Sequence, residues 1–284
     1  MAGLRTSVNQ WTRRALRAVA LVPFQLLGAE DRARVIDRLN KKMIAQIGGG
    51  DEVIRFVATT PLLQQRAASA LFKEPDTIRW IDSLPAGDVL WDIGANVGTF
   101  SLYAAKRRGL RVLAFEPSAG NYMVLCRNIQ LNGLGDRITA YCLALSGDKR
   151  LGVLNLGSDE LGGAVNQFGG EGEVSRYHSG TAAIGQQGMI GYPVDQFIAE
   201  FGAPFPNHLK IDVDGLEWAI LQGAAKALRD PRLRSMMVEL NITDSAEFDR
   251  VSAWLAQAGL AFSHQGEAQK SGNEAAANHF FVRR

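Results

Sequence analysis

The segment from Asp88 to Phe100 constrains the fold more than any other part of the chain. It begins with an apolar run typical of a buried strand, reaches Asp92, and turns on Gly94 and Gly98 before a helical pattern starts at Phe100. Glycine lets the backbone of such a turn come close to a ligand, and the free amides at the helix start point toward that ligand. The segment therefore predicts a nucleotide-binding turn between a strand and a helix.

The glycine spacing differs from the dinucleotide fingerprint G-x-G-x-x-G, because its second and third positions, counted from Gly94, hold Asn96 and Thr99. A second acid, Glu116, ends the next strand pattern, where a carboxylate can accept hydrogen bonds from both hydroxyl groups of a ribose. The turn would hold a small charged group rather than a pyrophosphate. S-adenosylmethionine fits these demands, since it has a ribose and an amino acid but no phosphate. The residues expected to bind this cofactor are Asp92, Gly94, Asn96, Gly98 and Glu116.

Several short segments follow one another at plausible spacing between Glu74 and Leu240. They are Asp92–Gly98, Phe115–Pro117, Ala144–Ser146, Leu209–Glu217 and Leu221–Gly223. Together they resemble the motif set of the FkbM-family methyltransferases. The resemblance implies a class I, S-adenosylmethionine-dependent transferase that usually methylates a hydroxyl group on a sugar or secondary metabolite. It also implies that Ala144 is among the cofactor-binding residues.

Two other classes of function remain open. A nicotinamide-dependent oxidoreductase would share the strand, the turn and the ribose acid, although Asn96 and Thr99 argue against it. A non-catalytic cofactor-binding protein would keep the fold around a degenerate pocket, although every cofactor position holds a competent residue.

The composition is that of a globular chain able to bury a sizeable core, with 284 residues, 46% hydrophobic and 21% charged. A net charge of +2 and the lack of a basic run in the body of the chain give no indication of nucleic-acid binding. Cys126 and Cys142 are too few for a disulfide framework or zinc site, so we expect them to be reduced and buried. We expect a cytoplasmic enzyme acting on a small-molecule or saccharide acceptor.

Residues 1–29 contain four arginines and no acidic residue, with apolar residues at helical spacing. The apolar part is interrupted by Arg17 and Pro23 and is shorter than the roughly 20 residues of a membrane span. We expect this segment to pack on the domain. The alternative is peripheral contact with an anionic membrane surface, which would suit an enzyme acting on glycolipids.

The chain before Pro85 has a helical pattern, interrupted by Gly48–Gly50, so we predict an N-terminal helical extension over residues 1–84 and a methyltransferase domain over residues 85–284. In the second part strand and helix patterns alternate. This predicts an α/β, Rossmann-like class I methyltransferase fold, with a seven-stranded, mostly parallel sheet and helices on both faces. The strands are expected at 88–93, 111–115, 138–142, 208–212, 235–240, 260–264 and 279–283, and the helices at 99–107, 119–131, 193–201, 216–228 and 244–258. We interpret Asn128 and Asn132 as turn-forming residues.

Between Gly157 and Gly191 the periodic pattern disappears, because ten of these 35 residues are glycine. A long loop inside a compact domain is usually functional or disordered. We expect this loop to extend from the side of the sheet where the carboxyl ends of the strands lie, which is where ligands bind in open α/β folds. We predict that residues 157–191 form an acceptor-binding lid, with plain disorder as the alternative.

Acidic residues gather where the predicted strand at 208–212 ends. Asp214 and Glu217 have the spacing of a helix capping box. Asp212 has no such explanation, and a strand-end acid beside the cofactor turn is costly unless it binds something. We therefore expect Asp212 to bind the acceptor and act as a base, since a positioned base accelerates transfer to a poorly nucleophilic hydroxyl group. Glu239, which ends the next strand, is the second candidate.

Two other types of chemistry are considered for this site. A histidine titrates near neutrality, so His178 in the predicted lid is a third candidate base, whereas His208 precedes a strand at the opposite end of the sheet and is expected to be structural. Oxygen ligands suit Mg²⁺, which Asp212, Asp214 and Glu239 would hold if the enzyme used a metal.

Overall fold

The computed structural model describes residues 23–169, 183–271 and 274–284. The chain divides into two compact units, residues 1–44 and residues 45–284. In the described part of the first unit, helix α2 (Ala29–Lys42) has no buried side chain, and Ile36 and Leu39 are exposed. The basic segment 1–22 lies outside the described residues, so the structure provides no test of its proposed contacts.

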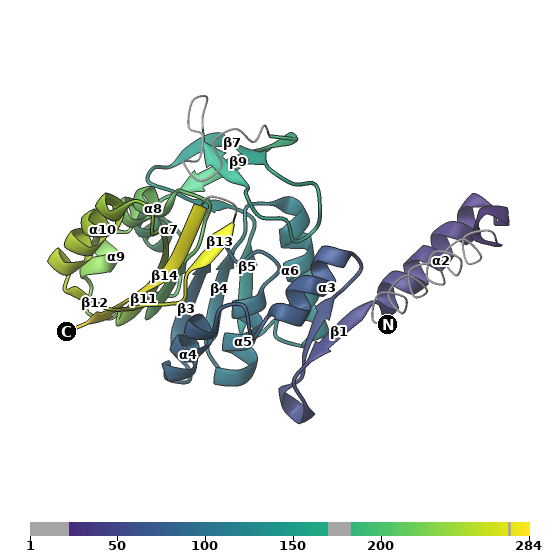
Figure 1. Ribbon diagram of the computed structural model, residues 1–284, viewed down its shortest axis with the longest axis horizontal. Coiled ribbons are helices and arrows are strands. Elements are labelled where there is room, and N and C mark those ends of the chain that lie inside the picture. The colour runs from purple at the N-terminus through teal and green to yellow at the C-terminus, as the bar shows by residue number, and fades with distance from the viewer. Residues whose placement is uncertain (1–22, 170–182, 272–273) are drawn as a thin grey trace, which may run out of the picture. The chain divides into compact units, whose positions relative to one another are not determined.

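The second unit is built on a sheet with the strand order β12-β14-β11-β10-β3-β4-β5 (Figure 1). The strands are β3 (Val89–Ile93), β4 (Arg111–Phe115), β5 (Ile138–Tyr141), β10 (His208–Ile211), β11 (Ser235–Asn241), β12 (Leu260–Gln265) and β14 (Glu274–Arg283). Strands β5, β4, β3, β10 and β11 are parallel, whereas β14 is antiparallel to both of its neighbours. The seven predicted strands and the Rossmann-like α/β fold are therefore confirmed. A short strand β13 (Gln269–Ser271) adds to β14.

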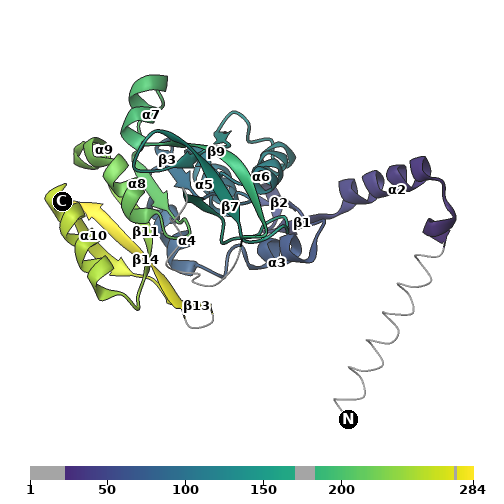
Figure 2. The same ribbon diagram turned by 90° about the horizontal axis from the view of Figure 1, so that it is seen from above.

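Helices cover both faces of this sheet (Figures 1 and 2). Leu90 of β3 packs in a cluster with residues of α4 (Pro75–Ser83), α5 (Thr99–Arg108) and α6 (Ala119–Leu131). Its neighbour Trp91 packs in a second cluster with residues of α7 (Val194–Phe201), α8 (Glu217–Gly223), α9 (Ala225–Arg229) and α10 (Ser245–Gln257). This alternation follows from the opposite directions of successive side chains in a strand.

The helix predicted at 216–228 is divided at Ala224 into α8 and α9. Asp195 explains the division, because its carboxylate accepts hydrogen bonds from the backbone amides of Lys226 (2.7 Å) and Ala227 (2.8 Å). These amides lie at the start of α9 and have no partner within that helix. The Asp195 side chain, which lies in α7, thus caps the start of α9.

A second sheet of four strands, in the order β6-β9-β7-β8, includes parts of residues 157–191, where no strand was expected, while their role as an acceptor-binding lid stays a prediction. Its strands are β6 (Ala144–Leu145), β7 (Arg150–Leu156), β8 (Gln167–Gly169) and β9 (Gly185–Tyr192), so two strands lie partly or wholly within the predicted loop. The glycines of this segment give it the composition of a loop, and Gly191 of β9, like Gly152 of β7, makes room for an aromatic ring. A Cβ atom on Gly152 or Gly191 would lie 2.6 or 2.5 Å from the ring of the buried Phe168. Residues 170–182, including His178, lie outside the described residues.

The predicted helical extension also differs from the structure. Strands β1 (Ile44–Ile47) and β2 (Ile54–Val57) form a two-stranded sheet, followed by α3 (Pro61–Ser69) and α4. Gly48 to Gly50 provide the turn between the strands, where a short 3₁₀ helix η1 (Gly50–Glu52) also lies. From Ala45 onward the chain belongs to the same compact unit as the main sheet.

Two asparagines at and near the end of α6 attach β2 to the domain. Asn128 lies within the helix rather than in a turn as expected, whereas Asn132 lies in the turn that follows α6, as expected. The Asn128 side chain accepts a hydrogen bond from the Val57 amide (2.7 Å) and donates one to the Val97 carbonyl (2.8 Å). The Asn132 side chain accepts from the Arg55 amide and donates to the Arg55 carbonyl. Side-chain amides thus supply the donors and acceptors that a neighbouring strand would otherwise provide.

Replacing Asn128 by Ala is expected to lower the free energy of unfolding by about 2–3 kcal/mol, because it leaves two backbone groups beside a fully buried position without a partner. Thermal or urea denaturation measures this loss. Gln130→Ala, at an exposed position of the same helix, is the matched control and should change stability by less than about 0.5 kcal/mol. Equal stability of the two variants would contradict the assigned role of Asn128.

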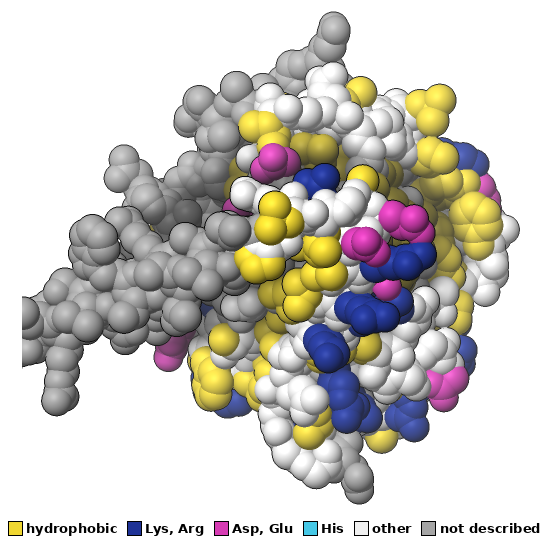
Figure 3. Space-filling model, turned by 90° about the vertical axis from the view of Figure 1, so that its right-hand side faces the viewer, with side chains coloured by type: hydrophobic (Ala, Val, Ile, Leu, Met, Phe, Trp, Pro, Cys, Tyr) yellow, Lys and Arg dark blue, Asp and Glu magenta, His cyan; other side chains and the backbone are white. Residues whose placement is uncertain are grey.

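The surface carries basic side chains in a row on one face, with acidic and hydrophobic side chains beside them (Figure 3).

The two cysteines differ in exposure. Cys142 is exposed and Cys126 is partly buried, so the expectation that both are buried is wrong. Among the described residues, no helix combines the length and the apolar character needed to cross a membrane.

Candidate functional site

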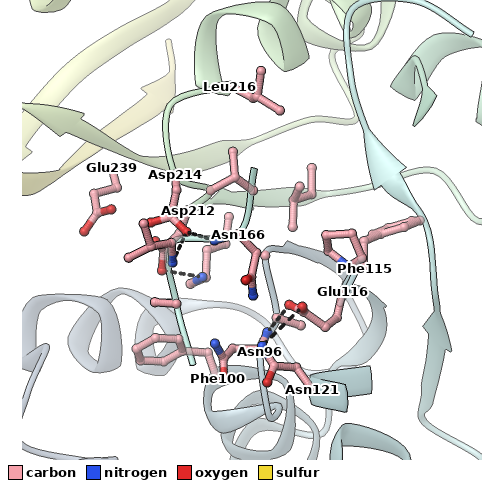
Figure 4. A pocket seen from close by; sticks show the side chains of 18 of the residues that line it. Asn96, Phe100, Phe115, Glu116, Asn121, Asn166, Asp212, Asp214, Leu216 and Glu239 are labelled. Carbon is pink, nitrogen blue, oxygen red and sulfur yellow. Dashed lines mark hydrogen bonds and ion pairs between the residues drawn. The ribbon is translucent and has the colours of Figure 1, made fainter. Parts of the chain in front are cut away.

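A cavity of 470 Å³ lies where β3, β4, β10 and β11 end at their carboxyl ends (Figure 4). Glu116 and Asn96 lie on one side of the cavity, and Asp212 and Glu239 lie on the other. The apolar residues Leu143, Ala144, Leu145 and Phe168 also line it. The cavity thus has two polar ends of different composition and an apolar wall.

The glycine turn joins the ends of three strands. The amides of Gly94 and Ala95 both donate to the Phe115 carbonyl at 3.0 Å, which fixes the end of β3 against the end of β4. Gly94 has a φ of +81°, and a Cβ atom there would lie 1.9 Å from the backbone oxygen of Asp212. Glycine is therefore required by both the conformation and the close approach of β10. Gly98, which directly precedes α5, also has a positive φ, of +88°.

Glu116 is buried beside this turn at the end of β4. Its carboxylate accepts hydrogen bonds from the backbone amides of Asn96 (2.8 Å) and Ser118 (3.0 Å). Burial raises the pKa of Glu116 to about 7, despite the opposing effect of these amides. Asn121 also donates to Oε1, at 3.5 Å, whereas Oε2 receives only the Asn96 amide, so the side chain, which lines the cavity, keeps acceptor capacity toward a ligand at Oε2.

Asp92 lies beneath the turn and is absent from the cavity lining, whereas it was expected to contact the cofactor. Its side chain is fully buried, accepts a hydrogen bond from Ser101 (2.6 Å) and lies 3.2 Å from the Lys210 ammonium. Lys210 also donates to Asp212 at 3.0 Å. Asp92 thus forms an ion pair with Lys210, and Lys210 forms a second ion pair with Asp212.

Asp212 and Glu239 form a pair of interacting carboxyl groups at the other end. Burial raises the pKa of Asp212, but the ammonium of Lys210 outweighs burial, and a hydrogen bond with Glu239 adds to its effect, so the pKa lies below its ordinary value. Repulsion from Asp212 is the largest cause that raises the pKa of Glu239 to about 10, and burial is the second. At neutral pH Asp212 is therefore ionised while Glu239 is protonated and donates to it.

Residues 162–166, which we call the strap, are attached by side chains from three elements. Asn121 accepts from the Gly162 amide (2.8 Å) and donates to the Gly163 carbonyl (2.9 Å). The Asn96 side chain also donates to the Gly163 carbonyl, at 3.0 Å. Asp214 accepts from the amides of Val165 (2.6 Å) and Asn166 (3.1 Å). The strap thus spans the site from the glycine turn to the end of β10.

The predicted capping box of Asp214 and Glu217 is therefore wrong. Asp214 binds the strap, and α8 begins at Glu217 without a side-chain cap. Glu217 instead accepts hydrogen bonds from the amides of Val213 and Gly215, both at 3.3 Å, while burial raises its pKa well above the ordinary value. Both acids stabilise the loop that carries Asp212 into the cavity.

Within residues 23–169, 183–271 and 274–284, no group of three acidic, histidine or cysteine side chains lies close enough together to bind a metal ion. The alternative that Asp212, Asp214 and Glu239 hold Mg²⁺ does not fit this arrangement, because Asp212 is paired with Lys210 and Asp214 with backbone amides. His208 is buried between Ser235 (2.8 Å) and Asp88 (3.0 Å), in agreement with its expected structural role. Ala144 lines the cavity at the start of β6.

Several residues that line the cavity were not among those predicted from the sequence. They are Arg66, Lys73, Asn121, Asn166 and Lys210. Lys210 lies in a segment whose acidic residues drew attention, and a lysine two positions before a strand-end acid was an available signal. Arg66 and Lys73 come from the region assigned to a helical extension, where no local pattern indicated a ligand.

Comparison with known proteins identifies one family whose model covers most of the cavity-lining residues, although Arg66 and Lys73 lie outside it. The model of the "Methyltransferase FkbM domain" family matches residues 92–262. The hexuronic acid methyltransferase AglP of Haloferax volcanii is 28% identical over 160 residues, which cover 55% of this chain and 58% of AglP. The methyltransferase sdnD of Sordaria araneosa is 39% identical over 82 residues, which cover 28% of this chain and 32% of sdnD. The chain thus spans less than two thirds of the length of either relative.

A solved structure of Pyrococcus horikoshii TYW2 in complex with MeSAdo aligns with a TM-score of 0.45 at 10% sequence identity, covering 85% of this chain and 72% of that one.

Proposed function

The chain belongs to the FkbM family of methyltransferases, and from this premise we propose that it transfers a methyl group from S-adenosylmethionine to a hydroxyl group of a sugar, glycolipid or secondary metabolite. The observation that carries the proposal is the cavity itself. It has a buried ribose-type acid, Glu116, at one end and the ionised Asp212 beside a protonated Glu239 at the other. The relative AglP is a hexuronic acid methyltransferase, which supports a sugar acceptor for this chain.

The residues present fit S-adenosylmethionine. Glu116 retains acceptor capacity for ribose hydroxyl groups, and the apolar wall of Leu143, Ala144 and Leu145 suits a flat adenine ring. The buried side-chain oxygen of Asn96 has no hydrogen-bond partner in the described structure, so it is available to a donor on a ligand. When bound, the cofactor supplies a methyl group already activated on a sulfonium.

Asp212 supplies the base in this proposal. Its ionised carboxylate accepts a hydrogen bond from the acceptor hydroxyl, aligns the oxygen, and takes the proton as the new oxygen–carbon bond forms. Lys210 holds this carboxylate in place, and Glu239 donates a hydrogen bond to it. The two neighbours fix the orientation of the base and keep a single negative charge on the pair.

Calorimetry with S-adenosylmethionine and its demethylated product tests the cofactor, and saturable binding of both is expected. Transfer of a radioactive methyl group to fractionated sugars, glycolipids and small metabolites then tests the activity. An ether product survives mild alkali, whereas a methyl ester is hydrolysed, which identifies the acceptor atom. No binding of either ligand, or displacement by a nicotinamide dinucleotide instead, would remove the proposal.

The ionisation of Glu116 should appear in cofactor affinity. A protonated carboxyl loses acceptor capacity, and the pKa is about 7, so the Kd is expected to rise about tenfold as the pH falls from 8 to 6. Glu116→Gln should lose this pH dependence and weaken binding at pH 8 by about 1.5–3 kcal/mol, the range for a hydrogen bond to a charged group. Calorimetric titration across the pH range measures both effects. Unchanged affinity at pH 8 would contradict the ribose role.

A further inference from the structure

We propose that the acceptor carries an anionic group, a carboxylate or a phosphate, and that Arg66 and Lys73 bind it beside the hydroxyl group to be methylated. This inference rests on the proposed function and specifies the class of its substrate. It comes from the positive charges of the cavity, which differ in how completely they are paired.

Arg66 projects from α3 into the cavity lining and is half-buried. Its Nε donates to the Gly162 carbonyl of the strap. Gly162 packs directly on it, since a Cβ atom there would lie 3.2 Å from the Arg66 Cδ. In the described part of the chain, no acidic side chain comes within 4.0 Å of its guanidinium. The terminal amino groups of a positioned, partly desolvated guanidinium therefore remain available.

Lys73 also lines the cavity, and its side chain is 58% exposed. Its ammonium lies 3.9 Å from Glu74, which is too far for a hydrogen bond. It is close enough to Asp212 to help lower the pKa of that carboxyl. Lys73 therefore faces the end of the cavity that contains the proposed base, rather than the end that contains Glu116.

The other charged groups of the cavity have hydrogen-bond or ion-pair partners, including Glu74, whose carboxylate accepts a hydrogen bond from Asn278 (2.9 Å). Lys210 lies 3.0 Å from Asp212 and 3.2 Å from Asp92, Glu116 receives two backbone amides, and Asp214 receives two from the strap. Glu239 is protonated at neutral pH. Among the cations of the described cavity, Arg66 has no acidic side chain within 4.0 Å, and Lys73 has Glu74 at 3.9 Å, beyond hydrogen-bond distance.

The chemistry of these two groups favours an oxyanion. A guanidinium offers parallel N–H donors that match a carboxylate or phosphate, and an ammonium adds a point charge. The strap fixes Arg66 through Nε alone, which leaves the donors suited to this geometry. The acids around Arg66 and Lys73 act on them without a hydrogen bond to either cation, so an oxyanion on the acceptor would give both a direct partner.

Binding to the protein saturated with S-adenosylhomocysteine tests the inference by calorimetry, with glucuronic acid, glucose 6-phosphate and glucose as probes. One or both acidic sugars should bind at least about tenfold more tightly than glucose, and their order distinguishes a carboxylate from a phosphate. Arg66→Gln and Lys73→Gln should each weaken acidic-sugar binding by about tenfold or more. Neither variant should change the affinity for glucose or S-adenosylmethionine by more than about twofold. Arg111→Gln, at the exposed amino end of β4, is the matched control and should leave every affinity unchanged.

Three outcomes would overturn the inference: equal binding of glucose and the acidic sugars, no binding of either acidic sugar, or a loss of S-adenosylmethionine affinity in Arg66→Gln as large as the loss for the acidic sugar. The third outcome would assign Arg66 to the carboxylate of the cofactor. Failure of the unmodified protein to bind S-adenosylmethionine is a separate result, which would remove the proposed function itself.

Discussion

Asp212→Asn is expected to lower the kcat of methyl transfer by about 10²–10⁴-fold, the usual contribution of a positioned base. The amide keeps the size of the side chain and a hydrogen-bonding oxygen, but it cannot take the proton of the acceptor hydroxyl. The Kd for S-adenosylmethionine should change by less than about twofold, because the expected ribose contacts lie at the opposite end of the cavity (Figure 4). Single-turnover transfer and calorimetry measure the two quantities separately.

Glu239→Gln provides the sharper comparison, because the two carboxyl groups differ in ionisation. Repulsion from Asp212 keeps Glu239 protonated at neutral pH, so a neutral amide that still donates a hydrogen bond should retain most of the activity. Asp136→Asn, at an exposed position away from the cavity lining, controls for the loss of a carboxylate in general. Full activity in Asp212→Asn together with an inactive Glu239→Gln would reverse the assignment and make Glu239 the base.

The parts of the site that the sequence could predict depend on neighbours along the chain. A strand, a glycine turn and a helix follow one another within the segment Asp88–Phe100, and Glu116 ends the next strand by the same rule. Parallel strands bring their carboxyl ends to one edge of the sheet, so Asp212 and Glu239 were also expected there. The structure places them in one cavity.

The parts that could not be predicted depend on contacts between distant segments. Asp214 binds amides 48 and 49 residues away, Arg66 binds a carbonyl 96 residues away, and Asn128 binds an amide 71 residues away. No local pattern specifies such partners. The strands β8 and β9 were missed for a different reason, because their glycines give the segment the composition of a loop, although one of them, Gly191, accommodates the Phe168 ring.

Gly94→Ala is expected to produce the largest loss of stability among these substitutions, about 3 kcal/mol. A left-handed backbone conformation costs a residue with a Cβ atom about 1–2 kcal/mol. The new atom would also lie 1.9 Å from the Asp212 backbone oxygen, so β3 and β10 must separate where they join at the cavity. Steric overpacking of this kind typically costs a further 1–3 kcal/mol. The melting temperature should fall by roughly 6–12 °C, and cofactor binding should be lost together with the turn.

Gly133→Ala separates the two contributions. Gly133 has a φ of +63°, but a Cβ atom there would meet no atom within 4 Å. This control therefore reports the conformational cost of about 1–2 kcal/mol alone, and its melting temperature should fall by about 2–8 °C with cofactor affinity intact. Equal losses in the two variants would show that the approach of Asp212 to the turn does not constrain residue 94. A much larger loss in Gly94→Ala would show that the close contact between residue 94 and the Asp212 backbone is required for stability. The cofactor end and the acceptor end of the cavity would then depend on this single backbone contact.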